Sequence, residues 1–230
     1  MQLTDHHFDP STALLLFGGG GHGKTLIDLV RASQKYTWVG IIDEQLPPGS
    51  DVLGVPVLGG ADVLASLHRQ GIQLAVNGVG GIGHPEIRQH IFELLGQAGF
   101  TCPVIVHPRA WVEPSATLED GVQVLAQAYV SSAAHIGFGT VINAGAVVSH
   151  DCTTGRCVNL SPGAMLAGGV HLADYVQVGM ASTINLNISV GERARIGNGA
   201  TVKGNVPAGA VIFAGTIWPP RKNIDTPLRA

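Results

Sequence analysis

A run of glycines near the start of the chain has the composition of a phosphate-binding turn. Residues 18–25 read Gly-Gly-Gly-Gly-His-Gly-Lys-Thr and follow the short apolar stretch Ala13–Phe17. Backbone N–H groups at the start of a helix bind phosphate, and a nearby lysine adds positive charge. The segment fits both the phosphate-loop and the dinucleotide patterns, but four adjacent glycines make either match unspecific. We therefore predict only phosphate or diphosphate binding, at Gly20, His22, Gly23 and Lys24; an ordinary strand-to-helix turn is the alternative.

Two carboxylates follow the next apolar stretch, 38–42. Asp43 and Glu44 stand where a second parallel strand would end. The carboxyl ends of such strands meet at one edge of the sheet, where ligands bind. We expect both carboxylates to accept hydrogen bonds from hydroxyl or base N–H groups of a ligand whose phosphates lie on the glycine turn.

A histidine and an aspartate stand together in the second half of the chain. Histidine ordinarily titrates near neutral pH, which suits a general base, and the chain has ten of them. His150 is followed directly by Asp151 and stands two residues after Val148, at a predicted corner where side chains point outward. A base here could remove a proton from an attacking amine or hydroxyl; a solvated histidine without function is the alternative.

The element that must position this histidine is a repeat of six residues. From Val106 to Val202 every sixth residue is Ile, Leu or Val, except for Thr154, and small or β-branched residues, including Cys152, stand two positions earlier. Residues two apart on a strand point to the same side. Three hexads therefore form one coil of a parallel β-helix, a solenoid of stacked coils. Gly and Asn often follow the aliphatic residue, and we expect them to adopt positive φ at the corners.

The same register predicts the placement of two other histidines. His135 and His171 are 36 residues apart, so they fall in one column, two coils apart. At the usual strand spacing this is roughly 10 Å, too far for both to bind one metal ion. We predict no metal site.

The first hundred residues alternate predicted strands with predicted helices. Strands are expected at 13–17, 38–42 and 74–76, and helices after the glycine run, at 62–70 and at 86–97. This order predicts a small, Rossmann-like α/β domain with a parallel sheet. We place it at residues 1–103 and the β-helix, with a C-terminal cap, at 104–230.

Composition excludes several classes of protein. The net charge of −3 gives no basic surface for nucleic acid. No apolar run approaches the ~20 residues of a membrane span, and no secretory signal is recognisable. Three cysteines without a CxxC pair fit a reducing cytoplasm. We expect a cytoplasmic protein that binds neither nucleic acid nor membrane.

Together these motifs resemble the bacterial sugar O/N-acyltransferase family over roughly residues 13–217. The resemblance rests on Gly-Gly-His-Gly-Lys at the first turn, a strand ending in Asp-Glu, the uninterrupted repeat, and the stretch Ile142–Cys152. It implies a left-handed β-helix, a homotrimer, acetyl-CoA as acyl donor and a nucleotide-sugar acceptor held by the α/β domain. It also implies that His150 is the general base, that Asp151 orients it, and that Asn159, Gly168, Gly169 and Met180 belong to the acetyl-CoA site. Backbone N–H groups of the Ala167–Gly169 turn could hold the thioester oxygen as it becomes negative.

The chain departs from the family pattern at two places. Asn159 stands where the family commonly has a second histidine, and asparagine cannot carry a proton. Trp218 stands near the C-terminus where small residues are usual, and we expect it to close the end of the solenoid.

The acceptor is left open by the sequence. The leading hypothesis is N-acetylation of a nucleotide-activated 4-amino-4,6-dideoxy sugar in surface-glycan biosynthesis. O-acetylation of a sialic acid or a similar sugar is an alternative, and a non-catalytic nucleotide-sugar-binding protein is another. A γ-type zinc carbonic anhydrase is disfavoured because no two histidines have its His-x₄-His spacing.

Overall fold

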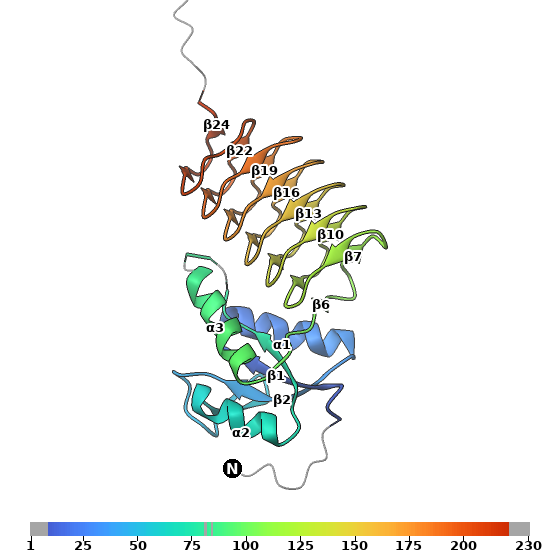
Figure 1. Ribbon diagram of the computed structural model, residues 1–230, viewed down its shortest axis with the longest axis vertical. Helices are drawn as coiled ribbons and strands as arrows, with labels where there is room; N and C mark the ends of the chain where they lie inside the picture. Colours follow the sequence, from blue (N-terminus) through green and yellow to red (C-terminus); the bar gives the residue numbers. More distant parts are fainter. Residues whose placement is uncertain (1–8, 81, 84, 221–230) are drawn as a thin grey trace, which may run out of the picture.

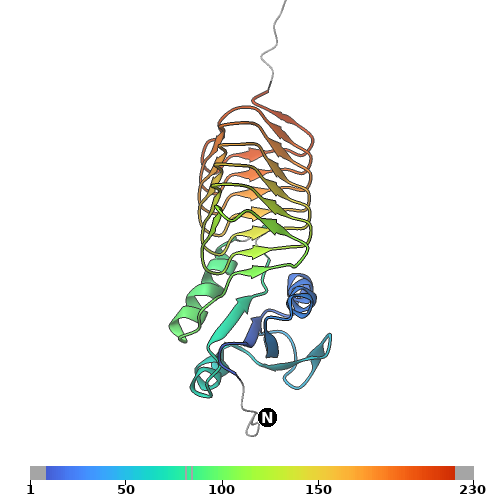
Figure 2. The same cartoon turned by 90° about the vertical axis from the view of Figure 1, so that its right-hand side faces the viewer.

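The computed structural model describes residues 9–80, 82–83 and 85–220. The chain forms a small α/β domain and a long three-sided column of stacked coils, and the α/β domain lies at the end of the column where the coils begin (Figures 1 and 2). Helix α3 lies beside the first coils in both views. The predicted fold class, an α/β domain followed by a left-handed β-helix, is confirmed.

The α/β domain contains a five-stranded sheet with strand order β3-β4-β2-β1-β5. All neighbours are parallel except the hairpin of β3 and β4. Its elements are β1 (Ala13–Phe17), α1 (Gly21–Ser33), β2 (Thr37–Ile42), β3 (Asp51–Val52), β4 (Val55–Gly59), a 3₁₀ turn η1 (Ala61–Val63), α2 (Leu64–Arg69), β5 (Leu74–Asn77) and α3 (Pro85–Gln97).

The column has three faces, each a parallel sheet of two-residue strands. Face 1 consists of β6 (Ile105–Val106), β9 (Gln123–Val124), β12 (Val141–Ile142), β15 (Asn159–Leu160), β18 (Gln177–Val178), β21 (Arg195–Ile196) and β23 (Val211–Ile212). Face 2 consists of β7 (Trp111–Val112), β10 (Tyr129–Val130), β13 (Val147–Val148), β16 (Met165–Leu166), β19 (Thr183–Ile184), β22 (Thr201–Val202) and β24 (Ile217–Trp218). Face 3 consists of β8 (Thr117–Leu118), β11 (His135–Ile136), β14 (Thr153–Thr154), β17 (His171–Leu172) and β20 (Ser189–Val190).

The repeating aliphatic residues form the core of the column. Each coil advances 18 residues, so that His135 pairs with Thr153 and Thr153 with His171. The second residue of each strand points inward, and Ile136, Val148 and Leu172 are fully buried. Cys152, in the small register, is also fully buried. The two-coil separation of the two histidines and the inward position of the cysteine are as predicted.

The corners differ in detail from the prediction. Positive φ occurs at the third residue after the aliphatic position, as at Gly139 (φ 66°) and Asp151 (φ 58°), and not at the residue directly after it. Glycine directly after the aliphatic residue has another cause, since a Cβ on Gly137 would lie 2.5 Å from the carbonyl oxygen of Gly155 in the next coil. Close backbone approach therefore requires that glycine.

The last coil is closed by Trp218. Its side chain is half-buried against the column's core, and its indole Nε1 donates to the carbonyl of Asn205 at 3.0 Å. The residue thus has the capping role expected of it; residues 221–230 of the predicted cap lie outside the described part of the chain. Among the described helices, none is long and apolar enough to cross a membrane.

Candidate functional site

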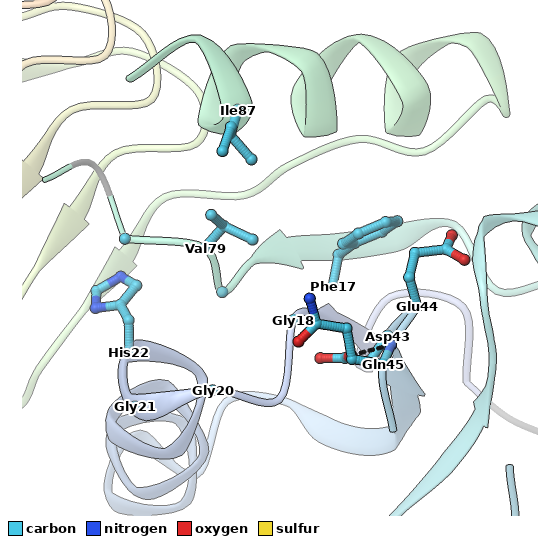
Figure 3. Close-up of a pocket in the computed structure, with 12 residues that line it drawn as sticks. Phe17, Gly18, Gly20, Gly21, His22, Asp43, Glu44, Gln45, Val79 and Ile87 are labelled. Carbon is cyan, nitrogen blue, oxygen red and sulfur yellow. Dashed lines mark hydrogen bonds between the residues drawn. The ribbon is translucent and has the colours of Figure 1, made fainter. Parts of the chain in front are cut away.

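A cavity of about 400 Å³ opens where β1, β2 and β5 end and α1 begins (Figure 3). We call it the strand-end cavity. Its lining residues are Phe17, Gly18, Gly20, Gly21, His22, Asp43, Glu44, Gln45, Gly78, Val79, Gly80 and Ile87. Four of the predicted substrate residues, Gly20, His22, Asp43 and Glu44, therefore line one cavity.

The glycine run shapes the floor of this cavity. Gly18 has φ +100°, which other residues rarely adopt, and a Cβ on Gly23 would strike the carbonyl of Gly18. Gly23 is thus buried beneath the turn, where it allows α1 to approach the end of β1. Helix α1 has no side-chain cap and no acidic residue in its first turn, which leaves its first N–H groups available to an anion.

The two carboxylates are partly occupied by backbone donors. Asp43 accepts from the N–H groups of Gly19 (2.8 Å), Gln45 (2.8 Å) and Leu46 (3.2 Å), and Glu44 accepts from the N–H of Ala61 (2.8 Å). These bonds fix both side chains at the rim of the cavity. Because a carboxylate has about four acceptor sites, each can still receive a hydroxyl or N–H of a ligand.

Lys24 does not join this group. Its side chain is exposed on α1, and no Lys or Arg occurs among the described residues that line the cavity. The negative charge of a bound diphosphate would therefore be balanced by backbone N–H groups and the helix dipole rather than by a cationic side chain.

His22 links the cavity to the solenoid. Its Nε2 lies 2.7 Å from Oε1 of Gln123, on β9 of face 1. The Gln123 amide is buried and donates in turn to the carbonyl of Asn77 at 2.9 Å. Burial, together with the positive charge of Arg88, lowers the pKa of His22 to about 4. At neutral pH the imidazole is uncharged.

A buried arginine behind the cavity joins the two domains. Arg88, on α3, is 1% exposed and donates to the carbonyls of Val79 (2.7 Å), Gly139 (2.9 Å) and Asn77 (3.2 Å). Burial lowers its pKa to about 10, so that it remains a cation at neutral pH. Sequence reasoning missed this residue and Gln123, because each acts through contacts with distant parts of the chain.

His150 lies at the corner between faces 2 and 3, with its ring exposed. Its Nδ1 is 2.7 Å from Oδ2 of Asp151. Because the carboxylate accepts, Nδ1 of the neutral ring carries the proton and Nε2 keeps a lone pair. The ring lies over Gly168, one coil further on, where a Cβ would come within 2.6 Å of the ring atoms Cε1 and Nε2.

Of the three N–H groups in the predicted oxyanion turn, Ala167–Gly169, two are used within the column, and that of Ala167 donates to the carbonyl of Ile184 at 2.9 Å. The N–H of Gly169 donates to the carbonyl of His150 at 3.0 Å, which ties the two coils together. Within the described residues, the Gly168 N–H has no such partner. Gly168, which is buried, therefore holds a backbone donor beside the His150 ring that is not used by another described residue.

A second hollow, of about 700 Å³, runs along face 1; we call it the face-1 groove. It is lined by Ile82, Gly83, Asn143, Ser161, Pro162, Gln177, Val178, Gly179, Met180, Arg195, Ile196, Gly197, Asn198, Val211, Ile212, Phe213 and Ala214. Met180 is half-exposed in it, and Asn159 is buried beside it, donating to the Ser161 hydroxyl at 3.2 Å.

The predicted site residues lie in two separate parts of the chain: the cavity and groove beside face 1, and the corner of His150. The strand-end cavity adjoins face 1 through Gln123, and the groove lies on face 1 itself. One coil runs through β12, β13 and β14 on faces 1, 2 and 3, so the corner of His150 is the vertex opposite face 1. A single chain therefore does not bring His150 and Gly168 together with Asn159, Met180 or the cavity. Among the described residues, no cluster of His, Cys, Asp and Glu is arranged to hold a metal ion.

Comparison with known proteins finds the same architecture. Residues 13–95 match the family described as PglD N-terminal domain. A single-residue variant of perosamine N-acetyltransferase from Caulobacter crescentus, solved with CoA and GDP-perosamine, is 31% identical over 87% of this chain and 93% of that one, with a TM-score of 0.83. The acetyltransferase domain of PglB from Neisseria gonorrhoeae FA1090, solved with acetyl coenzyme A, is 30% identical over 90% of this chain and 98% of that one, with a TM-score of 0.81.

WeeI from Acinetobacter baumannii AYE shares the fold at 22% identity, covering 87% of this chain and 96% of that one with a TM-score of 0.75. The first two matches extend over both domains. The chain therefore belongs to the nucleotide-sugar acyltransferase family and is itself an acyltransferase.

Proposed function

We propose that the chain transfers the acetyl group of acetyl-CoA to the amino group of a nucleotide-linked 4-amino-4,6-dideoxy sugar in the synthesis of a surface glycan. The single observation that carries the proposal is the His150 corner, where Asp151 holds the ring and Gly168 leaves space and an N–H beside it. The relatives solved with CoA, acetyl-CoA and GDP-perosamine support the choice of donor and acceptor.

The reaction follows from the tautomer of His150. Its Nε2 removes a proton from the acceptor amine as the nitrogen attacks the thioester carbonyl, and the C–N bond forms. The Gly168 N–H donates to the oxyanion of the tetrahedral intermediate. Collapse of the intermediate breaks the C–S bond, and the departing thiolate takes the proton from the His150 imidazolium. Asp151 stabilises that imidazolium while the proton is held.

The acceptor binds in the strand-end cavity, and the acetyl donor binds in the face-1 groove. The diphosphate lies on the first turn of α1, and Asp43 and Glu44 accept hydrogen bonds from the nucleoside. Acetyl-CoA occupies the face-1 groove, where Met180 supplies apolar contact and Asn159 contributes an amide in place of the second histidine of the family.

The active site is completed by a second copy of the chain, in a homotrimer. His150 lies opposite face 1, so the cavity and groove of one copy need the histidine corner of another. Face 2, which ends at that corner, points seven uncharged side chains outward: Trp111, Tyr129, Val147, Met165, Thr183, Thr201 and Ile217. Packing this face against face 1 of the next copy is a heterologous contact, which a three-sided column closes after three copies.

The test is a thiol-release assay with acetyl-CoA and a panel of UDP-, GDP- and dTDP-linked 4-amino sugars, with CMP-sialic acid as the O-acetylation alternative. We expect release with one of the amino sugars, and a fall in kcat of about 10²–10⁴-fold for His150→Ala. The matched control is His171→Ala, a histidine on face 3, which should leave kcat unchanged.

Near-wild-type turnover of His150→Ala would exclude this histidine as the base. Release with CMP-sialic acid alone would replace the amine acceptor by a hydroxyl. Binding of nucleotide sugars without any thiol release would favour the non-catalytic alternative.

A further inference from the structure

The hydrogen bonds around Gln123 fix the tautomer of His22. The carbonyl of Asn77 can only accept, so the Gln123 amide must turn its NH₂ group toward Asn77 and its oxygen toward His22. That oxygen is also only an acceptor. His22 must therefore carry its proton on Nε2, which leaves Nδ1 with a free lone pair.

The surroundings of His22 also fix its charge. Arg88, which approaches from α3, is a cation, and Gln123, which approaches from the solenoid, is neutral. His22 is the second residue of α1, where the helix dipole disfavours a further positive charge. The pKa of about 4 has burial as its main cause. Between pH 6 and 8 the ring is thus a neutral imidazole with one acceptor nitrogen.

The place of the ring within the cavity decides which part of a ligand it meets. In Figure 3, Asp43, Glu44 and Gln45 lie at one end, the glycine turn lies in the middle, and His22 lies at the other end. Gln123 marks this last end as the one beside the solenoid. A nucleotide sugar with its diphosphate on the glycine turn and its nucleoside near Asp43 therefore extends its sugar toward His22.

We propose that His22 recognises the sugar: Gln123 holds it in the Nε2–H tautomer, and its free Nδ1 accepts a hydrogen bond from a sugar hydroxyl. The inference rests on the proposed function for the identity of the ligand. A diphosphate offers only acceptor oxygens, which an unprotonated nitrogen repels, whereas a hydroxyl offers the donor that Nδ1 lacks. Among the described residues, Nδ1 has no partner of its own. Gln123 is then a positioning residue, acting through His22.

Two substitutions of His22 separate its two nitrogens. In His22→Asn the amide oxygen can take the place of Nδ1, whereas in His22→Gln the longer side chain reaches toward Gln123 and the acceptor near Nδ1 is lost. We expect His22→Asn to keep the KM for the nucleotide sugar within about twofold, and His22→Gln to raise it about three- to tenfold, the loss of one hydrogen bond. The KM for acetyl-CoA, whose proposed groove does not include residue 22, should be the same in both variants. A higher KM for the nucleotide sugar in His22→Asn than in His22→Gln would overturn the proposal.

The tautomer itself can be observed in the free protein. With ¹⁵N-labelled histidine, NMR should show His22 with an unprotonated Nδ1 and a protonated Nε2 at every pH between 6 and 8. Gln123→Met should abolish this preference, while Gln177→Met, at the equivalent place on β18, should leave it intact. A protonated Nδ1 in the free protein would refute the proposal whatever reaction the chain catalyses.

Ligand titration in the same experiment separates this inference from the proposed function. The nucleotide sugar should shift the Nδ1 resonance as it accepts a hydrogen bond, and the matching nucleoside diphosphate should not. An equal shift with both ligands would overturn recognition of the sugar. If the nucleotide sugar shifts Nδ1 but no acetyl transfer occurs, the inference stands and the proposed function fails.

Discussion

At the scale of single residues, the identity of residue 168 is explained by its neighbour one coil earlier. The ring of His150 occupies the space that a side chain at Gly168 would need, and Gly168 is buried beneath that ring. A glycine here thus lets the His150 ring lie against the column, because no Cβ occupies that space.

We expect Gly168→Ala to reduce kcat about 10- to 100-fold, because the added methyl group displaces the base, and a misplacement of about 1 Å can cost that much. The thermal unfolding midpoint should change little, since the ring is exposed and can swing away. Steady-state kinetics with both substrates saturating, and a melting curve, measure the two effects.

Gly96→Ala, on α3 in open space, is the matched control for the same change of residue. It should retain the kcat of the unmodified protein. A kcat of Gly168→Ala within twofold of that value would show that the position of the His150 ring does not limit the reaction.

Some roles of single residues could be predicted from sequence and others could not. The inward position of Cys152 and the capping position of Trp218 follow from the six-residue register, which is local information. The bond between His22 and Gln123 joins residues 101 apart, and no local pattern marks it. The hydrogen bond from the Gly169 N–H to the carbonyl of His150 could not be predicted either, because it depends on how neighbouring coils stack.

At the scale of elements, the strands and helices with a clear period were predicted closely. The expected strand at 13–17 is β1, and the expected helix at 86–97 begins one residue earlier, at Pro85. The hairpin of β3 and β4 was missed. Its two-residue turn, Leu53-Gly54, has positive φ at both positions, and leucine at the first of them removes the Asn-Gly type of signal by which such turns are recognised.

Arg88 makes α3 a structural link between the domains. Its guanidinium holds the Asn77–Val79 wall of the cavity on one side and the Gly139 corner of the solenoid on the other. We expect Arg88→Met to leave three carbonyls without this donor and to lower the free energy of unfolding by about 3 kcal/mol. The melting temperature, by calorimetry at fixed protein concentration, should fall by roughly 5–10 °C.

The matched control for this change is Arg69→Met, an exposed arginine on α2. It should melt within about 1 °C of the unmodified protein, as surface substitutions usually do. Equal melting temperatures for the two variants would mean that the link through Arg88 contributes nothing net to stability.

At the scale of the whole molecule, the proposed division of the site between two copies of a trimer has a direct test by mixing. We expect His150→Ala to be inactive because it lacks the base, and Gly20→Phe to be inactive because the ring fills the strand-end cavity, where a Cβ on Gly20 meets no other atom. In mixed trimers some sites combine an intact cavity from one copy with an intact histidine from the next. Co-refolding equal amounts should restore about a quarter of the wild-type activity, as random assembly of a heterologous ring predicts.

Each variant refolded alone is the control, and it should stay inactive. Mixing without refolding should restore activity only as fast as the copies exchange. Co-refolded mixtures that stay as inactive as their parents would show that each site uses the cavity and histidine of the same chain.

The two ends of the column differ from its sides, because a stack of parallel coils leaves a row of open backbone groups at its first and last coil. Such a row can bind the end of another column, and repetition of that contact would give a fibre. The α/β domain covers one end. At the other end Trp218 packs against the core, and Pro219 has no N–H to offer. We therefore expect the indole and the proline to hinder end-to-end stacking of one column on another, which the open edge of a parallel coil would otherwise favour.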